Sequence, residues 1–170
     1  WLDTSGTAAI VCFPGIMYRG GAEKKIRKYL IDNNFVEAII QLPDNLFYGT
    51  PIATCILVLK KSKKDNKILF IDASKEFVKV TNSNKLTDQN IENVITHLND
   101  RKDSQYLTKL VTIDDVAEQD YNLSVSTYVE QKDTREKIDI DQLNKDIEEV
   151  VKRENELRKA IDKIIADLKG

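Results

Sequence analysis

The feature that most constrains the fold is residues 35–60, two apolar runs separated by a loop of turn-forming residues, FVEAIIQLPDNLFYGTPIATCILVLK. The runs FVEAII and IATCILVL are rich in β-branched residues, which predicts two strands that are each buried on at least one side. The chain must leave the sheet between them, because turn formers concentrate there: Pro43, Asp44, Asn45, Gly49 and Pro51. The loop also carries Leu46, Phe47 and Tyr48, which form either a local core or a surface that meets a ligand.

The residues before this stretch predict a strand, a helix and a right-handed crossover. Residues 8–13, AAIVCF, are apolar without alternation, which is typical of a strand covered on both faces inside a parallel sheet. From Ala22 onwards, apolar residues such as Ile26 and Leu30 recur at helical spacing. Strand, helix and strand with short joints predict that strands 8–13 and 35–42 are parallel.

The following segments predict a hairpin and a second packing helix. Strand 52–60 and strand 68–72 are joined by the polar turn SKKDN, which indicates an antiparallel hairpin at the edge of the sheet. From Thr87, an apolar stripe at i, i+3, i+4 and i+7 predicts a helix that packs on this sheet. One crossover helix cannot cover both faces of a strand that is apolar all round, so we expect a further part of the protein on the N-terminal side.

Residues 111–129 lack a clear period and predict a connecting strap with a short helix around 114–117 and buried side chains at Tyr121, Leu123, Val125 and Tyr128. The pattern as a whole predicts three parts. Residues 1–86 form a partial sheet, residues 87–138 a packing helix and strap, and residues 139–170 a long amphipathic helix.

The last segment has an apolar stripe that needs a partner. A helix of about 30 residues would be about 45 Å long. Leaving seven aliphatic side chains in water would forgo on the order of 10–20 kcal/mol, so the stripe must be covered by a second copy, by this chain or by another subunit. The stripe alternates in steps of three and four and is interrupted only by Glu154: Leu143, Ile147, Val150, Leu157, Ile161, Ile164 and Leu168.

Composition excludes several classes of function. A net charge of −2 gives no global attraction to nucleic acid or to a membrane, and no run is long enough to cross one. Cys12 and Cys55 lie in apolar runs and predict small buried residues in a reducing compartment, and the single histidine, His97, has no ligand framework, so we expect no metal site. These features predict a cytoplasmic protein.

Catalytic motifs are absent from the sequence. It contains no glycine-rich phosphate loop with a lysine, no nucleophile elbow, no paired cysteines and no cluster of metal ligands. Taken by its residues alone, the chain is not a complete enzyme.

Four stretches occur in the order found in one known family: FPGIMYRGGAEKKIRKYLIDNNFVEAIIQLPDNLFYGTPIATCILVLKK, ILFIDAS, DDVAEQDYNLSVSTYV and the charged terminal helix. With them the chain resembles the C-terminal part of the modification (M) subunit of type I restriction-modification systems. The resemblance implies an α/β fold, with part of a Rossmann-like methyltransferase sheet followed by a long C-terminal helix. It also implies a DNA adenine-N6 methyltransferase that uses S-adenosylmethionine and works with a specificity (S) subunit and a restriction (R) subunit.

The departures from the family limit what can be carried over. The family's S-adenosylmethionine loop and its Asn-Pro-Pro-aromatic catalytic motif have no equivalent in residues 1–170. We therefore expect neither cofactor binding nor methyl transfer by these residues alone. By position, Phe47 resembles the aromatic that stacks on the flipped-out adenine, with Tyr48 beside it, and Arg19 is a weaker prediction for phosphate contact.

The resemblance gives the terminal helix a partner, because M subunits end in helices that pack on the S subunit. Self-association of the chain through this helix is the competing prediction. A different class of function also stays open at this point, namely a non-catalytic coiled-coil assembly module with a small α/β scaffold. The DNA target sequence is not readable from the chain, since recognition in such systems belongs to the S subunit.

Overall fold

The computed structural model describes residues 2–131 and 140–169, with side chains up to residue 167. The chain forms two compact units, Trp1–Lys132 and Asp133–Gly170. The first unit is a mixed α/β domain, and the second contains one long helix.

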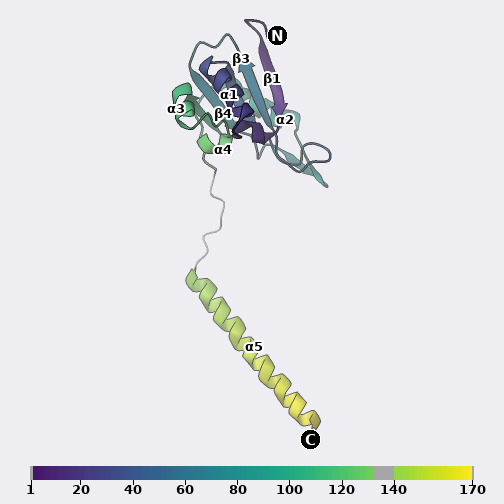
Figure 1. The fold of residues 1–170 in the computed structure, drawn as a ribbon. Helices are drawn as coiled ribbons and strands as arrows, with labels where there is room; N and C mark the ends of the chain where they lie inside the picture. Colours follow the sequence, from purple (N-terminus) through teal and green to yellow (C-terminus); the bar gives the residue numbers. More distant parts are fainter. Residues whose placement is uncertain (1, 132–139, 170) are drawn as a thin grey trace. The chain divides into compact units, whose positions relative to one another are not determined.

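A five-stranded sheet in the order β1-β3-β2-β4-β7 organises the first unit (Figure 1). Strand β3 runs antiparallel to both β1 and β2, β2 and β4 are parallel, and β7 is antiparallel to β4. The α/β fold predicted from the sequence is therefore confirmed. The strands are β1 Thr7–Cys12, β2 Val36–Gln41, β3 Cys55–Lys60, β4 Lys67–Asp72 and β7 Thr108–Thr112.

Two predictions about strand pairing have different outcomes. Strands β1 and β2 point the same way, as predicted, but they are not neighbours because β3 lies between them. The predicted hairpin of residues 52–60 with residues 68–72 is wrong, since β4 pairs with β2 and β7. The connection formed by residues 61–66 is long enough to cross the end of β2. The apolar strand β4 therefore lies between β2 and β7, inside the sheet, where its side chains are buried.

The prediction that β1 lies inside a parallel sheet is also wrong for the described residues. Strand β1 pairs only with β3 and forms an edge of the sheet, so Ile10 and Val11 are 45% and 56% exposed. Continuous apolarity correctly indicated a strand, but it carries no information about which neighbours are present.

Helices cover the two faces of the sheet with separate cores. On one face, the 3-10 helix η1 (Pro14–Met17) and the helices α1 (Ala22–Asp32), α3 (Ile113–Glu118) and α4 (Val125–Tyr128) contribute to a cluster centred on Phe70 and Ile39. On the other face, Val94 and Leu98 of α2 (Asp88–Asp100) pack on Ala38, Ile40 and Leu69. The predicted packing of this helix on the sheet is confirmed.

Local chemistry explains the helix boundaries. Helix α2 begins with a capping box in which the Thr87 hydroxyl accepts from Asn90 N, while Asn90 Oδ1 accepts from Thr87 N. Thr112 and Asp115 form the same arrangement at α3, the short helix predicted at residues 114–117. These caps satisfy N–H groups that the first turn of a helix leaves without partners.

The strap that follows α3 is tied to α1 by a buried arginine. Arg27 Nε donates to Tyr121 O at 2.8 Å and Nη1 donates to Ile16 O at 2.7 Å. Burial lowers the pKa of Arg27, and the carboxylates of Asp120 and Glu23 oppose that shift. Lys24 pairs with Asp120, and Lys28 lies over the Tyr121 ring. Three cations of α1, Lys24, Arg27 and Lys28, therefore hold this part of the chain.

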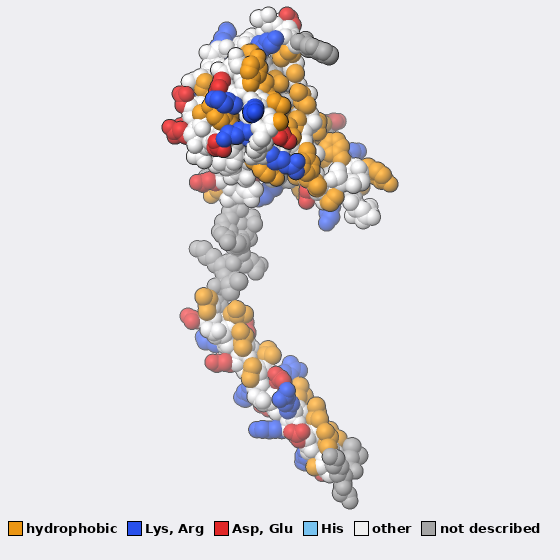
Figure 2. All heavy atoms as spheres, in the orientation of Figure 1, with side chains coloured by type: hydrophobic (Ala, Val, Ile, Leu, Met, Phe, Trp, Pro, Cys, Tyr) orange, Lys and Arg blue, Asp and Glu red, His pale blue; other side chains and the backbone are white. Residues whose placement is uncertain are grey.

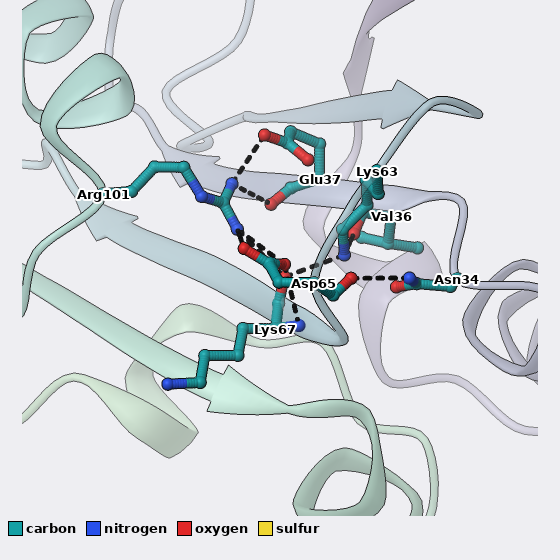
Figure 3. Close-up of polar contacts among 7 residues, drawn as sticks. All are labelled: Asn34, Val36, Glu37, Lys63, Asp65, Lys67 and Arg101. Carbon is teal, nitrogen blue, oxygen red and sulfur yellow. Dashed lines mark hydrogen bonds and ion pairs between the residues drawn. The ribbon is translucent and has the colours of Figure 1, made fainter.

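A second polar network closes the opposite end of the sheet around Arg101, the left-handed C-cap of α2 with φ 47° (Figure 3). Its guanidinium donates to Glu37 Oε1 at 2.6 Å, to Lys67 O at 3.1 Å and to Asp65 Oδ1 at 3.3 Å. Lys63 Nζ donates to Val36 O and Lys67 O, and burial lowers the pKa of this amine to about 8. Arg101 thus joins α2, β2, β4 and the β3–β4 connection.

The second unit consists of α5, Ile140–Lys169, a helix of 30 residues. Its existence and length agree with the prediction. Leu143, Ile147, Val150, Leu157, Ile161 and Ile164 are exposed, and the side chain of Leu168 lies outside the described residues. Val151 and Ile165, which the sequence reasoning missed, widen the same apolar stripe.

Candidate functional site

The connections that leave the sheet at the carboxyl ends of β1, β2 and β4 share one edge. These three strands point the same way, so residues 13–21, 42–54 and 73–87 all begin at that edge. In open α/β sheets, ligands bind outside the carboxyl ends of the strands. Arg19 and the Phe47 loop, predicted separately from the sequence, therefore lie on connections at the same edge of the domain.

The loop of residues 42–54 is closed at its base by hydrogen bonds. Leu42 N donates to Thr54 O at 2.9 Å, and Gln41 Nε2 donates to the same oxygen at 3.2 Å. Further out, Gly49 has φ +79° and allows a tight reversal in which Thr50 N donates to Phe47 O at 3.4 Å. The base is thus firmly joined to the sheet, whereas the tip is held by longer bonds.

The three large side chains of the loop have different environments. Leu46 is half-buried and packs on the cluster that contains Leu42 and Ile71. Phe47 is 46% exposed and Tyr48 is fully exposed. The sequence left open whether these residues form a local core or an exposed surface. Leu46 belongs to a local core, whereas the rings of Phe47 and Tyr48 face solvent.

A small hairpin that the sequence reasoning missed lies against this loop. Strands β5 (Val78–Val80) and β6 (Ser83–Lys85) form a separate two-stranded sheet. Together the loop and the hairpin line an open hollow of about 570 Å³, with Asn82 and Ser83 facing the loop residues. Strands of three residues are too short for a periodic signal, but alternating Val78 and Val80 before the polar turn Thr81–Asn82 was the available hint.

The loop and the hairpin expose apolar side chains next to one another. Both project from the same side of the domain in Figure 1, and Figure 2 shows hydrophobic side chains on that projection. The exposed residues are Phe47, Tyr48, Ile52, Val78 and Val80. Contiguous exposed apolar surface of this kind commonly marks a contact site.

Arg19 is exposed on the connection after β1. Its guanidinium carbon lies 5.8 Å from the centroid of the Phe13 ring, and a side chain at Gly15 would come within 2.9 Å of Arg19 Nε. The arginine therefore lies over a glycine turn and an aromatic ring. It forms no ion pair within the described part of the chain, so its charge is available to an anion.

The remaining reactive side chains near this edge lack activation. Burial raises the pKa of the Cys55 thiol to about 12 and also raises the pKa of Cys12, which lies opposite it on β1. Thiols with raised pKa values are weak nucleophiles and poor metal ligands at neutral pH. Residues 2–131 and 140–167 contain no group of three or more His, Cys, Asp or Glu side chains that could hold a metal ion.

Solved structures with this fold include methyltransferase subunits. The type I restriction-modification methyltransferase subunit from Streptococcus thermophilus superposes with a TM-score of 0.71 and 39% identity, over 74% of this chain and 27% of that one. Among curated proteins, the type I restriction enzyme MpnII methylase subunit of Mycoplasma pneumoniae is 49% identical over 99% of this chain. The MjaVIII methylase subunit of Methanocaldococcus jannaschii is 40% identical over 90% of it.

The family model described as N-6 DNA Methylase matches residues 1–137, which is most of the chain. The chain belongs to this family. It spans 31% and 27% of the length of the two curated relatives. No helix in the described parts of the chain is long and apolar enough to cross a membrane.

Proposed function

We propose that the chain is the C-terminal part of a type I M subunit that, as a whole, methylates adenine N6 in DNA, and that this part presents the ring of Phe47 to the flipped-out adenine. The observation that carries the proposal is the exposure of Phe47 and Tyr48 at the carboxyl edge of the sheet, on a loop whose base is fixed by Leu42 and Thr54. The exposed edge strand β1 supports a further part of the subunit beside this domain.

The energetics of base flipping give an exposed ring a function. An enzyme that modifies a base must extrude it from the duplex at a cost of a few kcal/mol, and stacking on an aromatic ring returns about 1–3 kcal/mol per base. Phe47 has the exposure that stacking requires, while Leu46 anchors the chain beside it. Tyr48 is a second ring within reach of the same ligand, and Arg19 supplies a positive charge for a DNA phosphate at the same edge.

The described residues do not fit S-adenosylmethionine, the cofactor that the family implies. The sequence of these residues lacks the family's S-adenosylmethionine-binding glycine loop and its Asn-Pro-Pro-aromatic catalytic motif. We therefore assign cofactor binding and methyl transfer to the rest of the subunit and expect these 170 residues alone to give no turnover with labelled cofactor.

The test replaces Phe47 by Ala in the full-length subunit assembled with its S subunit. We expect single-turnover methylation to fall about 5- to 150-fold, the equivalent of losing 1–3 kcal/mol of stacking. A fluorescent adenine analogue at the target position should lose its flipping signal to the same degree. Phe47→Trp should restore both measurements, because it supplies a ring of similar or greater area.

Ile52→Ala is the matched control for the ring, because Ile52 belongs to the same exposed apolar surface and has the same exposure, 46%, as Phe47, but has no aromatic ring that could stack on a base. It should leave methylation and the flipping signal close to the wild-type values. Equal rates for Phe47→Ala and the wild type would show that the ring does not stack on the base.

We further propose that α5 docks on helices of the S subunit. The exposed residues repeat with a period of seven, with Ile140, Ile147 and Ile161 in one position and Leu143, Leu157 and Ile164 in the other. Val151 and Ile165 make the stripe wider than a two-stranded seam, which suits a bundle with more than one partner helix. The complete assembly would also include DNA and the R subunit in the cytoplasm.

Self-association is the second candidate for this helix, and Glu154 disfavours it. Glu154 lies seven residues after Ile147 and seven before Ile161, so it occupies the heptad position that these two isoleucines fill in the neighbouring repeats. In a parallel, in-register pair of α5 helices, two Glu154 carboxylates would face each other in the apolar seam. A partner with a basic side chain at that level has no such cost. Family membership also favours a methylase subunit over a coiled-coil assembly module.

A further inference from the structure

The β5–β6 hairpin is bonded to the loop that carries Phe47 through a single residue, Asn84. Its side-chain Nδ2 donates to Asp44 O at 2.9 Å and to Asp44 Oδ1 at 2.8 Å. Its backbone N donates to Asn45 O at 3.0 Å. One asparagine of the hairpin therefore satisfies three oxygens on two consecutive loop residues.

These bonds hold the loop where its own contacts are weakest. Asn45 has φ 50°, a left-handed conformation that costs a non-glycine residue free energy unless its surroundings hold it. The nearby loop bonds, Asn45 N to Pro51 O at 3.3 Å and Thr50 N to Phe47 O at 3.4 Å, are long. The contacts from Asn84 are shorter, and they act two and three residues before Phe47 in the chain.

The hairpin can brace the loop because it is itself fixed to α2. Glu76, just before β5, accepts hydrogen bonds at 3.1 Å from Asn90 Nδ2 and Asn93 Nδ2 of that helix. Asn84 lies opposite Lys79 in the β5–β6 ladder. A continuous series of contacts thus runs from α2, which packs on the sheet, through the hairpin to Asp44.

The chemistry of asparagine suits this position. An amide NH₂ group has two N–H donors, and it can serve a carbonyl and a carboxylate oxygen of one residue at the same time. A bond to an ionised carboxylate is stronger than one between neutral groups. Aspartate in place of Asn84 would remove both donors and set a second negative charge against Asp44.

We propose that Asn84 is a positioning residue for base stacking, which holds residues 44–48 in the conformation that presents Phe47 to the flipped adenine. The inference rests on the proposed function of Phe47. A loop that is ordered before DNA arrives loses less conformational entropy when the base stacks on it. Removing the brace should therefore weaken flipping and the methylation step more than binding of the DNA duplex, which the S subunit reads.

The test compares Asn84→Ala with Lys85→Ala in the full-length subunit assembled with the S subunit. Lys85 is the next residue of β6, and its exposed side chain points to the opposite face of the hairpin. Asn84→Ala keeps the backbone bond to Asn45 and removes only the two bonds to Asp44. Hydrogen exchange measured on a peptide covering residues 42–54 should become about tenfold faster in Asn84→Ala and should not change in Lys85→Ala.

A conservative change on the other side of the contact completes the set. Asp44→Asn keeps both acceptor oxygens, so the loop should exchange within about twofold of the wild-type rate. Peptides from β2 and β4 should exchange at wild-type rates in every variant, which separates loosening of the loop from failure to fold. If hydrogen exchange of residues 42–54 is unchanged in Asn84→Ala, then Asn84 does not hold the loop in place and the proposal is wrong.

The functional measurement is made with a fluorescent adenine analogue at the target position and with single-turnover methylation. We expect Asn84→Ala to reduce both signals about three- to tenfold, with the DNA dissociation constant changed less than twofold. If Phe47→Ala reduces flipping and Asn84→Ala does not, the positioning role is wrong and the proposed function stands. If Phe47→Ala leaves flipping unchanged, the proposed function fails, and this inference fails with it.

Discussion

Replacement of Arg101 by Met should destabilise the α/β unit by about 2–3 kcal/mol, although Arg101 lies far from the aromatic loop along the sheet. Methionine keeps an unbranched side chain and the left-handed backbone of this C-cap, so the change removes only the guanidinium (Figure 3). The charge on Glu37 then stays in place with a side chain that is only 15% exposed.

The magnitude follows from the partners of the guanidinium. A charge-assisted hydrogen bond such as the 2.6 Å contact with Glu37 Oε1 contributes about 1.5–3 kcal/mol. Asp65 is 50% exposed, so its pair with Arg101 contributes about 0–1 kcal/mol. The bond to Lys67 O adds about 0.5–1.5 kcal/mol, part of which water regains. We expect the loss of unfolding free energy to lie in the lower half of the range that these three contributions span together, because water enters the space that the guanidinium leaves.

The assay is denaturant unfolding of the purified chain, followed by near-ultraviolet circular dichroism of its tyrosines. Tyr128 reports on the packed unit, since its ring lies 4.2 Å from that of Phe70. Lys109→Met is the control, because Lys109 pairs with Asp103 at 3.0 Å with both side chains half exposed, and it should cost less than about 1 kcal/mol. Equal losses for the two variants would refute the reasoning that burial gives the Arg101 network its stability.

The remaining predictions concern Lys63 and α5. Burial lowers the pKa of Lys63 from 10.5 to about 8, so between these pH values the folded chain holds fewer protons at this amine than the unfolded chain. The free energy of unfolding should therefore rise as the pH increases from about 8 to about 10.5. After allowance for solvent screening, we expect a rise of about 1–2 kcal/mol. Lys63→Met should remove this rise relative to the wild type in denaturant unfolding measured across that pH range, and an identical pH profile in both proteins would contradict it. In α5, Leu157→Lys should abolish copurification of the full-length subunit with the S subunit, and Glu154→Leu should make the purified chain self-associate in sedimentation equilibrium. A wild-type chain that already forms dimers at micromolar concentration would argue for self-association instead.

The sequence predicted the elements whose signals are local. The helices α1, α2 and α5 follow from apolar periodicity, and α3 follows from a short acidic start that Thr112 caps. Strands β2 and β3 follow from apolar β-branched runs, although β3 begins at Cys55 rather than at residue 52. In each case the information lies within a few residues of the element itself.

The pairing of the strands could not be predicted in the same way. A polar connection after β3 is equally compatible with a β3–β4 hairpin and with a connection that crosses β2 to its far side. Only the packing of buried side chains such as Phe70 favours the position of β4 inside the sheet. Strand β7 was missed because Lys109 interrupts its short apolar pattern. The β5–β6 hairpin was missed for a similar reason, and with it the contact between Asn84 and Asp44, residues that are far apart in sequence.

By itself, the sequence determined that residues 42–54 form a loop between two strands and that an aromatic cluster lies in it, because Pro43, Asn45 and Gly49 impose turns through local sterics. Only the tertiary structure decided which side chain of that cluster is buried. Leu46 finds an apolar cluster beneath it, whereas Phe47 and Tyr48 do not. Burial depends on contacts with residues that are distant in the chain, and a local sequence pattern does not predict those contacts.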